Sequence, residues 1–478
     1  MLENLTLFII INIINGAGYS LISPLLPILG KRENLSESEL GWMIGIFPIS
    51  SCIMTTMIPI LGKKFSRIKL LSYATFFAAI STFLYSVLIF ISNKTLLIVF
   101  FFALRIFHGF CATIVCVLIS SLNISSSKKE NTQSNLGKSE IALSIGTSIS
   151  PLICSIFYKI GGYTLPFLFT GAFSILAFCL SFQINDKKIR KESDEVEDDN
   201  NYNYLKYLTY PEIYSILLGF VFCMISVTFS YPCLTYHLIN NYSISVSIAS
   251  LFFIAPMVPY IITSQFLDKI SAKIGIYFTF SLGLFLSGIS SLFVYPTPPL
   301  AQSPINILIG FFILGIGSVP VFIPGLVMLS KNIKKIDDSI DEMSANDIAA
   351  AIYNLFVELG NFIGPILGGY LTDNFGFKLC CIIISTIVVT CSAIFFVFFY
   401  STIKNDFILL CKNNKSNEKD NNSEELIEKE YDENYFKTIK ASMLVNKISS
   451  RHSSTSLNEK IKNNNSDSRI SVCSTLTE

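Results

Sequence analysis

Long apolar stretches alternate with short polar segments along most of the chain. An α-helix of about 20 residues crosses a hydrocarbon core of about 30 Å, and twelve of the stretches are long enough to do so. They lie near 5–29, 41–61, 69–92, 96–120, 138–160, 164–183, 212–236, 245–267, 274–294, 305–329, 347–371 and 378–400. The pattern therefore predicts an all-α membrane protein with twelve transmembrane helices.

A charged segment divides these stretches into two groups of six. Two groups of this kind are typical of two pseudo-symmetric helical bundles with a site between them. We predict an N-terminal six-helix bundle over 1–183, a cytoplasmic linker over 184–211 and a C-terminal six-helix bundle over 212–400. The remaining segment, 401–478, is rich in Asn, Ser, Lys and Glu, which predicts a disordered cytoplasmic tail.

The distribution of Lys and Arg predicts the orientation. Alternate loops carry 4, 3, 5, 2 and 3 basic residues, and the opposite loops carry 5 together. The basic loops are 62–69, 122–138, 184–211, 268–273 and 330–346. Because basic loops stay in the cytoplasm, we expect both termini to be cytoplasmic, in a vesicular, other endomembrane or plasma membrane.

Composition agrees with a bilayer protein and excludes several classes of function. Hydrophobic residues make up 51% and charged residues 14%, against roughly 25% charged residues in soluble domains. The net charge of +1 and the lack of a DNA- or RNA-reading motif predict no nucleic-acid partner. Scattered histidines, cysteines within apolar stretches and the lack of a nucleophile–base set predict no metal, no cofactor and no enzymatic activity. Without a phosphate-binding Gly-Lys-Ser/Thr loop, uphill transport would need an ion gradient.

One pattern of Gly and Pro occurs once in each half, in GKSEIALSIGTSISPLICS and AIYNLFVELGNFIGPILGGYL. The first copy contains Gly137, Gly146 and Pro151. The second copy contains Gly360, Gly364, Pro365, Gly368 and Gly369. Gly and Pro inside an apolar helix permit close helix packing and bending. One copy arises easily by chance, but two in register indicate a transporter whose helices pack closely and move.

Charged side chains inside apolar stretches are functional candidates, because each costs about 2.5–3.5 kcal/mol at the helix centre. Glu358 lies near the middle of its stretch, one turn after Asn354. Glu140 aligns with Asn354 when the two copies are superposed. Arg105 and His108 lie together in another stretch. The alternatives are structural: carboxylates paired with Arg105 or with Ser and Asn, an arginine that holds helices together, and a packed neutral histidine.

Several of these residues carry a family resemblance. The block RIFHGFCA resembles the fourth-helix Arg-x-x-Gln-Gly motif of major facilitator superfamily antiporters, with His108 in place of Gln. The repeated pattern resembles their fifth-helix motif. Their gating loop after the second helix, and its counterpart in the second half, are partly matched by Gly62, Arg67, Asp268 and Lys269. The resemblance covers roughly 5–400 and implies the major facilitator fold.

Within that superfamily the chain is most similar to vesicular amine and polyamine transporters, which exchange lumenal protons for cytosolic organic cations. The similarity includes Gly137-x-x-Glu140 and Tyr231-Pro232. Asn15 and Asn354 stand where monoamine transporters have Asp. The resemblance therefore implies proton-coupled antiport, with Glu140 and Glu358 as the acids for an extended cation such as a polyamine.

Two other functions stay open at this point. One is a facilitator-fold carrier of another small metabolite or drug, and the other is a non-transporting membrane sensor that signals through its tail. For the transporter we expect a small-molecule substrate, protons and the lipid bilayer as partners, and a monomeric protein.

Overall fold

The computed structural model describes residues 4–126, 132–184, 204–295, 302–337, 340, 342–406 and 408. All regular elements in these ranges are helical. Most of the predicted linker and almost all of the predicted tail lie outside the described residues. The predicted boundaries of the bundles, the linker and the tail therefore stay predictions.

The first half contains seven α-helices and one short 3-10 helix in its described part. Their bounds are α1 Asn4–Ser20, α2 Ile22–Arg32, α3 Glu37–Lys64, α4 Arg67–Val87, η1 Leu88–Phe90, α5 Lys94–Ser126, α6 Thr132–Gly161 and α7 Thr164–Ser181. A short helix, α9 Tyr204–Tyr207, precedes the second half.

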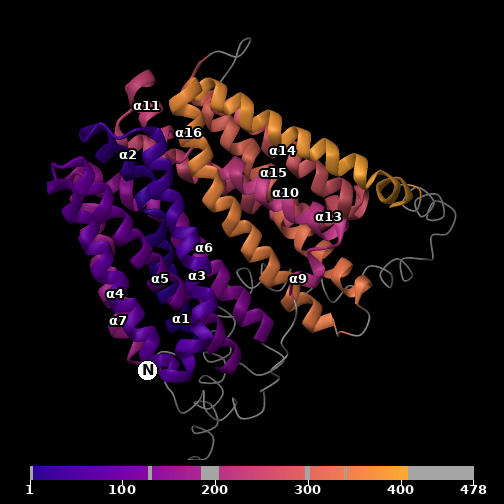
Figure 1. Ribbon diagram of the computed structural model, residues 1–478, viewed down its shortest axis with the longest axis horizontal. Coiled ribbons are helices and arrows are strands. Elements are labelled where there is room, and N and C mark those ends of the chain that lie inside the picture. The colour runs from indigo at the N-terminus through magenta and orange to yellow at the C-terminus, as the bar shows by residue number, and fades with distance from the viewer. Residues whose placement is uncertain are drawn as a thin grey trace, which may run out of the picture.

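The second half repeats this organisation. Its elements are α10 Pro211–Thr228, α11 Leu234–Tyr242, α12 Val246–Leu251, η4 Phe252–Ile254, α13 Met257–Ile274, α14 Ile276–Val294, α15 Pro304–Ile336 and α16 Glu342–Phe398. In Figure 1 the helices of the first half, in indigo and purple, form one group, and those of the second half, in pink and orange, form the other.

The predicted number of spans is confirmed. Within the described ranges, 11 helical segments are long and apolar enough to cross a membrane. The last of them, Ile348–Phe398, is 51 residues long, but Gly376 within it has φ 80° and ψ 156°. Glycine adopts a positive φ without a steric penalty, so the chain changes direction there. This segment is two consecutive spans, which gives twelve.

Three predicted spans are interrupted, which the apolar pattern did not show. The first breaks between α1 and α2, the seventh ends at Thr228 before α11 begins, and the eighth is divided between α12 and α13. Each break lies four residues or fewer before a proline: Pro24, Pro232 and Pro256. A proline cannot donate to the carbonyl four residues earlier, and its ring clashes with that carbonyl.

Two predicted loops are shorter than expected. The helix α3 continues to Lys64, and α4 begins at Arg67. The helix α13 continues to Ile274. Gly62, Asp268 and Lys269 therefore lie within helices and not in loops, because the apolar periodicity extends past these polar residues.

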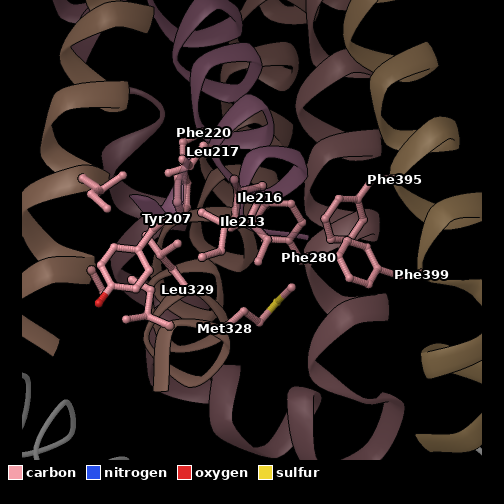
Figure 2. Close-up of a cluster of buried hydrophobic side chains, with 14 of the residues drawn as sticks. Tyr207, Ile213, Ile216, Leu217, Phe220, Phe280, Met328, Leu329, Phe395 and Phe399 are labelled. Carbon is pink, nitrogen blue, oxygen red and sulfur yellow. The ribbon is translucent and has the colours of Figure 1, made fainter. Parts of the chain in front are cut away.

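Each half has its own hydrophobic core, made of two clusters of buried side chains. Figure 2 shows one cluster of the second half, where Phe220 of α10 packs edge-on against Phe280 of α14, with ring centroids 6.0 Å apart. In the same cluster, the ring centroid of Phe395 of α16 lies 4.6 Å from that of Phe280. Large apolar side chains also face outward, such as Phe90, which is 75% exposed. Outward apolar surface of this kind fits contact with lipid.

The two halves contact each other at the end of the molecule where α2 and α11 lie (Figure 1). There α3 and α16 approach closely, because a Cβ atom on Gly41 would overlap the Pro365 carbonyl oxygen. One turn further, a Cβ on Gly45 would lie 2.9 Å from the Phe362 carbonyl oxygen. From this end α16 runs away from α3 toward the end at which α1 begins (Figure 1).

Candidate substrate cavity

A cavity of about 240 Å³ lies between the two halves. From the first half, its polar lining residues are Tyr19, Ser20, Ser23, Arg105, Thr147 and Ser148. From the second half, its lining includes Met224, Thr228, Tyr231, Phe253, Met257 and Asn361. Helices α1, α5 and α6 thus face α10, α13 and α16 across a space of the size that suits a small organic molecule.

The three interrupted spans meet at this cavity. Ser20 ends α1, Thr228 ends α10, and Met257 begins α13. Backbone groups at helix ends have no partner within the helix, and discontinuous helices place such groups at substrate sites in transporters. Pro151 of α6 and Pro365 of α16, from the two copies of the repeated pattern, also line the cavity.

Arg105 contributes the positive charge of the cavity. Its side chain is 1% exposed, and Nε and Nη1 have no hydrogen-bond partner. The guanidinium carbon lies 4.6 Å from the ring centroid of Phe47 and 5.6 Å from that of Tyr19. Among the residues that line this cavity in the described part of the chain, Arg105 alone is charged.

Glu358 lies close to the cavity on the opposite half. Its side chain is partly buried, and the Nδ2 atom of Asn361 is 3.5 Å from its Oε2 atom. Asn361 itself lines the cavity. The carboxylate of α16 therefore contacts an amide of the cavity lining. Sequence analysis missed Asn361, although its spacing of three residues from Glu358 places both on one helix face.

Asn15 and His108 lie together, but away from the central cavity. They line a separate cavity of about 20 Å³ inside the first half. Asn15 donates from Nδ2 to the Ala112 carbonyl oxygen at 3.2 Å. The His108 side chain is 2% exposed, and its Nδ1 has no partner. Asn15 is not among the residues that line the central cavity, whereas Tyr19, Ser20, Ser23 and Pro24 are; its role in a cation site stays a prediction.

The two remaining polar candidates are not part of the described cavity lining. Asn354 is exposed on α16 and does not line the central cavity. Glu140 lies on α6, but its side chain is outside what the structure describes. Of the aromatic residues, Tyr231 lines the cavity and stacks edge-on with Phe253, at 5.6 Å between ring centroids.

The repeated pattern packs equivalent helices in the two halves. In the first copy, a Cβ on Gly146 would overlap the Ile13 carbonyl oxygen of α1. In the second copy, a Cβ on Gly360 would lie 2.6 Å from the Met224 Cβ of α10. Further along α16, a Cβ on Gly364 would overlap the Thr228 side chain at the end of α10. A Cβ on Gly368 or Gly369 would overlap the carbonyl oxygen of Phe229 or Glu37, respectively. Gly137 lies on α6, before the part whose side chains are described.

The predicted gating residues are not among the residues that line the cavity. Arg67 begins α4 and donates from Nη1 to Ser121 Oγ of α5 at 3.3 Å. Asp268 and Lys269 lie near the end of α13. The contact of Arg67 joins two helices of the same half, so the described contacts of these residues give no gate between the halves.

A different contact closes the molecule at the α2–α11 end. Asp373 of α16 accepts hydrogen bonds from the backbone N–H groups of Glu37 and Ser38, at 2.9 and 2.8 Å. These groups begin α3, where the helix dipole favours a negative charge. Sequence analysis did not predict this contact, because its partners are separated by more than 300 residues.

We expect Asp373→Asn to open this end of the molecule. The change removes the charge and one of the two acceptors, which at an exposed site is worth about 1 kcal/mol, or about fivefold in an equilibrium. Cys233 is buried at the same end, with Sγ 3.2 Å from Thr372 Oγ1. The rate of maleimide labelling at Cys233, measured by mass spectrometry, should rise about fivefold. Asp406→Asn is the control, and an unchanged rate in Asp373→Asn would show that the contact does not hold this end closed.

His237 lies on α11 at the same end. Burial lowers its pKa to about 4, and its ring lies 4.8 Å from that of Phe377. His237 is therefore neutral near pH 7 and packs against Phe377.

Comparisons of the sequence with known proteins point to one family of membrane transporters. The sequence model of the Major Facilitator Superfamily matches residues 8–336 and 216–442. The MFS-type transporter SLC18B1 of Mus musculus is 24% identical over 376 residues, which cover 75% of this chain and 78% of that protein. The quinolone resistance protein NorA of Staphylococcus aureus is 25% identical over 369 residues, which cover 74% and 86%.

Solved structures agree in fold. The crystal structure of the nucleoside transporter NupG superposes with a TM-score of 0.68 at 12% identity, covering 83% of this chain and 99% of that one. At this identity the likeness concerns the arrangement of the helices only.

Proposed function

We propose that this chain, which belongs to the Major Facilitator Superfamily and is thus a membrane transporter and not an enzyme, exchanges protons for a small organic cation. The cation is a polyamine or another amine, and the membrane is an endomembrane or the plasma membrane. Support for a cation comes from the sequence resemblance to amine and polyamine transporters and from the acid on α16.

Glu358 is the observation that carries this proposal. A carboxylate inside a span is expensive unless it is protonated or paired. At Glu358 a proton and a substrate amine would compete for the same negative charge, next to Asn361, which lines the cavity and contacts the carboxylate. Competition of this kind couples release of the proton to binding of the cation. The site then changes its access from one side of the membrane to the other while it holds either the proton or the cation. Transport of this kind is antiport.

The contact between the halves supports the same cycle. With both termini in the cytoplasm, as the basic loops predict, the end closed by Asp373 faces away from the cytoplasm. The cavity is then positioned to load substrate from the cytoplasmic side. Opening of the Asp373 contact and closure at the other end would move the cavity's access to the far side.

Uptake into reconstituted vesicles tests this function. With an acidic lumen, labelled spermine should accumulate, and for one-to-one exchange a gradient of one pH unit supports about tenfold accumulation. Unlabelled spermine or spermidine should compete more strongly than serotonin or dopamine. The monoamines are the matched control, because they carry a single amine. Uptake that ignores the pH gradient would identify an uncoupled carrier, and stronger competition by monoamines or anions would reject the polyamine assignment.

A further inference from the structure

The buried guanidinium of Arg105 has no counter-charge in the described structure. Its Nε and Nη1 atoms have no hydrogen-bond partner, and its side chain is 1% exposed. No described carboxylate lies within ion-pair distance of it. An unpaired buried charge is strongly unfavourable, whereas the same charge is stable once an anion pairs with it and accepts its hydrogen bonds.

Phe47 and Tyr19 contact the face of this guanidinium and leave its Nε and Nη1 groups without an acceptor. Their ring centroids lie 4.6 and 5.6 Å from the guanidinium carbon. Cation–π contacts of this kind attract the charge to the ring face, but they do not replace acceptors for the in-plane N–H groups. A planar fork of N–H donors is the arrangement that binds a carboxylate.

The surroundings of Arg105 fit an anion. The cavity lining places hydroxyl groups of Ser20, Ser23 and Thr147 on the same half as Arg105. Hydroxyl groups can donate further hydrogen bonds to a bound anion. The negative group of the site, Glu358, lies on the other half and contacts Asn361 of the cavity lining. The cavity therefore has a positive pole on α5 and a negative pole on α16.

We infer that Arg105 binds a singly charged anionic group together with the transported cation. The group is either a carboxylate on the substrate itself, which makes the substrate a zwitterion, or a free anion such as chloride that enters with an amine. In either case the cargo contacts both halves at once, with its amine toward Glu358 and its anionic group at Arg105. This inference rests on the proposed transport of an organic cation through the same cavity.

A matched pair of ligands tests whether the anionic group is a carboxylate on the substrate itself. Cadaverine has the carbon chain and both amines of lysine but lacks the carboxylate. In thermal-shift titrations of the purified full-length protein, lysine should bind about tenfold more tightly than cadaverine. Arg105→Gln should remove this preference, and Lys159→Gln, which removes an exposed cation on α6, should retain it.

Replacement of chloride by a larger anion tests whether the anionic group is a free anion that enters with the amine. Cadaverine should then bind about tenfold more tightly in chloride than in gluconate, which is too large to share the cavity with the amine. Arg105→Gln should remove this dependence on chloride. Equal binding of lysine and cadaverine, together with equal binding in chloride and gluconate, would overturn the inference. A preference that persists in folded Arg105→Gln would overturn it as well.

A measurement on the unsubstituted protein covers the case in which Arg105→Gln does not fold. Phenylglyoxal modifies arginine, and its reaction at Arg105 can be followed by peptide mass spectrometry. Lysine, or chloride with cadaverine, should slow this reaction about tenfold relative to cadaverine in gluconate. No protection at Arg105 by either would contradict the inference. These readouts measure binding, so a protein that shows them without proton-driven uptake rejects the antiport and leaves the anion site intact.

Discussion

Glu358→Gln is expected to abolish proton-driven accumulation while the protein stays folded and inserted. Glutamine keeps the size of the side chain and an oxygen that can accept a hydrogen bond from Asn361. In the unsubstituted protein the Asn361 Nδ2 atom lies 3.5 Å from Glu358 Oε2. It cannot release a proton or carry the negative charge that an amine requires. With an acidic lumen, accumulation of labelled spermine should fall at least about tenfold, the ratio that one pH unit of gradient supports.

Counterflow separates loss of coupling from loss of the protein. Exchange of internal for external substrate needs no net proton movement, so Glu358→Gln should reduce counterflow less than accumulation. Glu212→Gln removes an exposed carboxylate at the start of α10. It is the control for the loss of one negative charge and should leave accumulation unchanged. Full accumulation in Glu358→Gln would show that the proton travels elsewhere.

Gly368→Leu should block transport, through failed assembly or a fixed conformation. A Cβ atom at this position would overlap the carbonyl oxygen of Phe229 and lie 2.7 Å from its carbonyl carbon. Both are backbone atoms at the point where α10 ends, so no side chain can rotate away. Overpacking of this kind costs about 1–3 kcal/mol or more. We expect less than about a tenth of normal uptake, with reduced yield in detergent.

A second substitution on α16 controls for side-chain size. Ala351→Leu adds the same kind of bulk on the same helix, but Ala351 is exposed, so uptake should stay close to normal. If Gly368→Leu also transported normally, α16 and α10 would have to separate by more than the structure shows. The close contact between these two helices would then not be required in any state of the cycle.

The sequence predicted the spans well because length and apolar content are enough to identify them. Hydropathy did not reveal where a span is interrupted, since apolar residues continue across each break. The prolines did contain that signal: Pro24, Pro232 and Pro256 each follow the last regular turn before a break. Residues at or next to these breaks line the cavity, such as Tyr19 in the last turn of α1 and Tyr231 between α10 and α11.

The candidate site was only partly accessible from sequence. Arg105 was found by its motif and Glu358 by its charge within a span, and both lie at or beside the cavity. Asn15 was chosen by alignment with an acid of other transporters, but it faces the interior of the first half. The direction of a side chain depends on the rotation and tilt of its helix, and these are set by packing against helices distant in sequence.

The closure by Asp373 also bears on what comparisons of many sequences can detect. Its partners are the main-chain N–H groups of residues 37 and 38, which every amino acid except proline provides. Pairs of positions vary together when one side chain compensates for a change in another, and main-chain groups give no such signal, although the Ser36 and Ser38 side chains also hydrogen-bond to Asp373. Related transporters with this contact can therefore differ freely at 37 while 373 stays acidic. Coevolution would therefore report only the side-chain part of this closure and leave its main-chain part undetected, however many sequences were aligned.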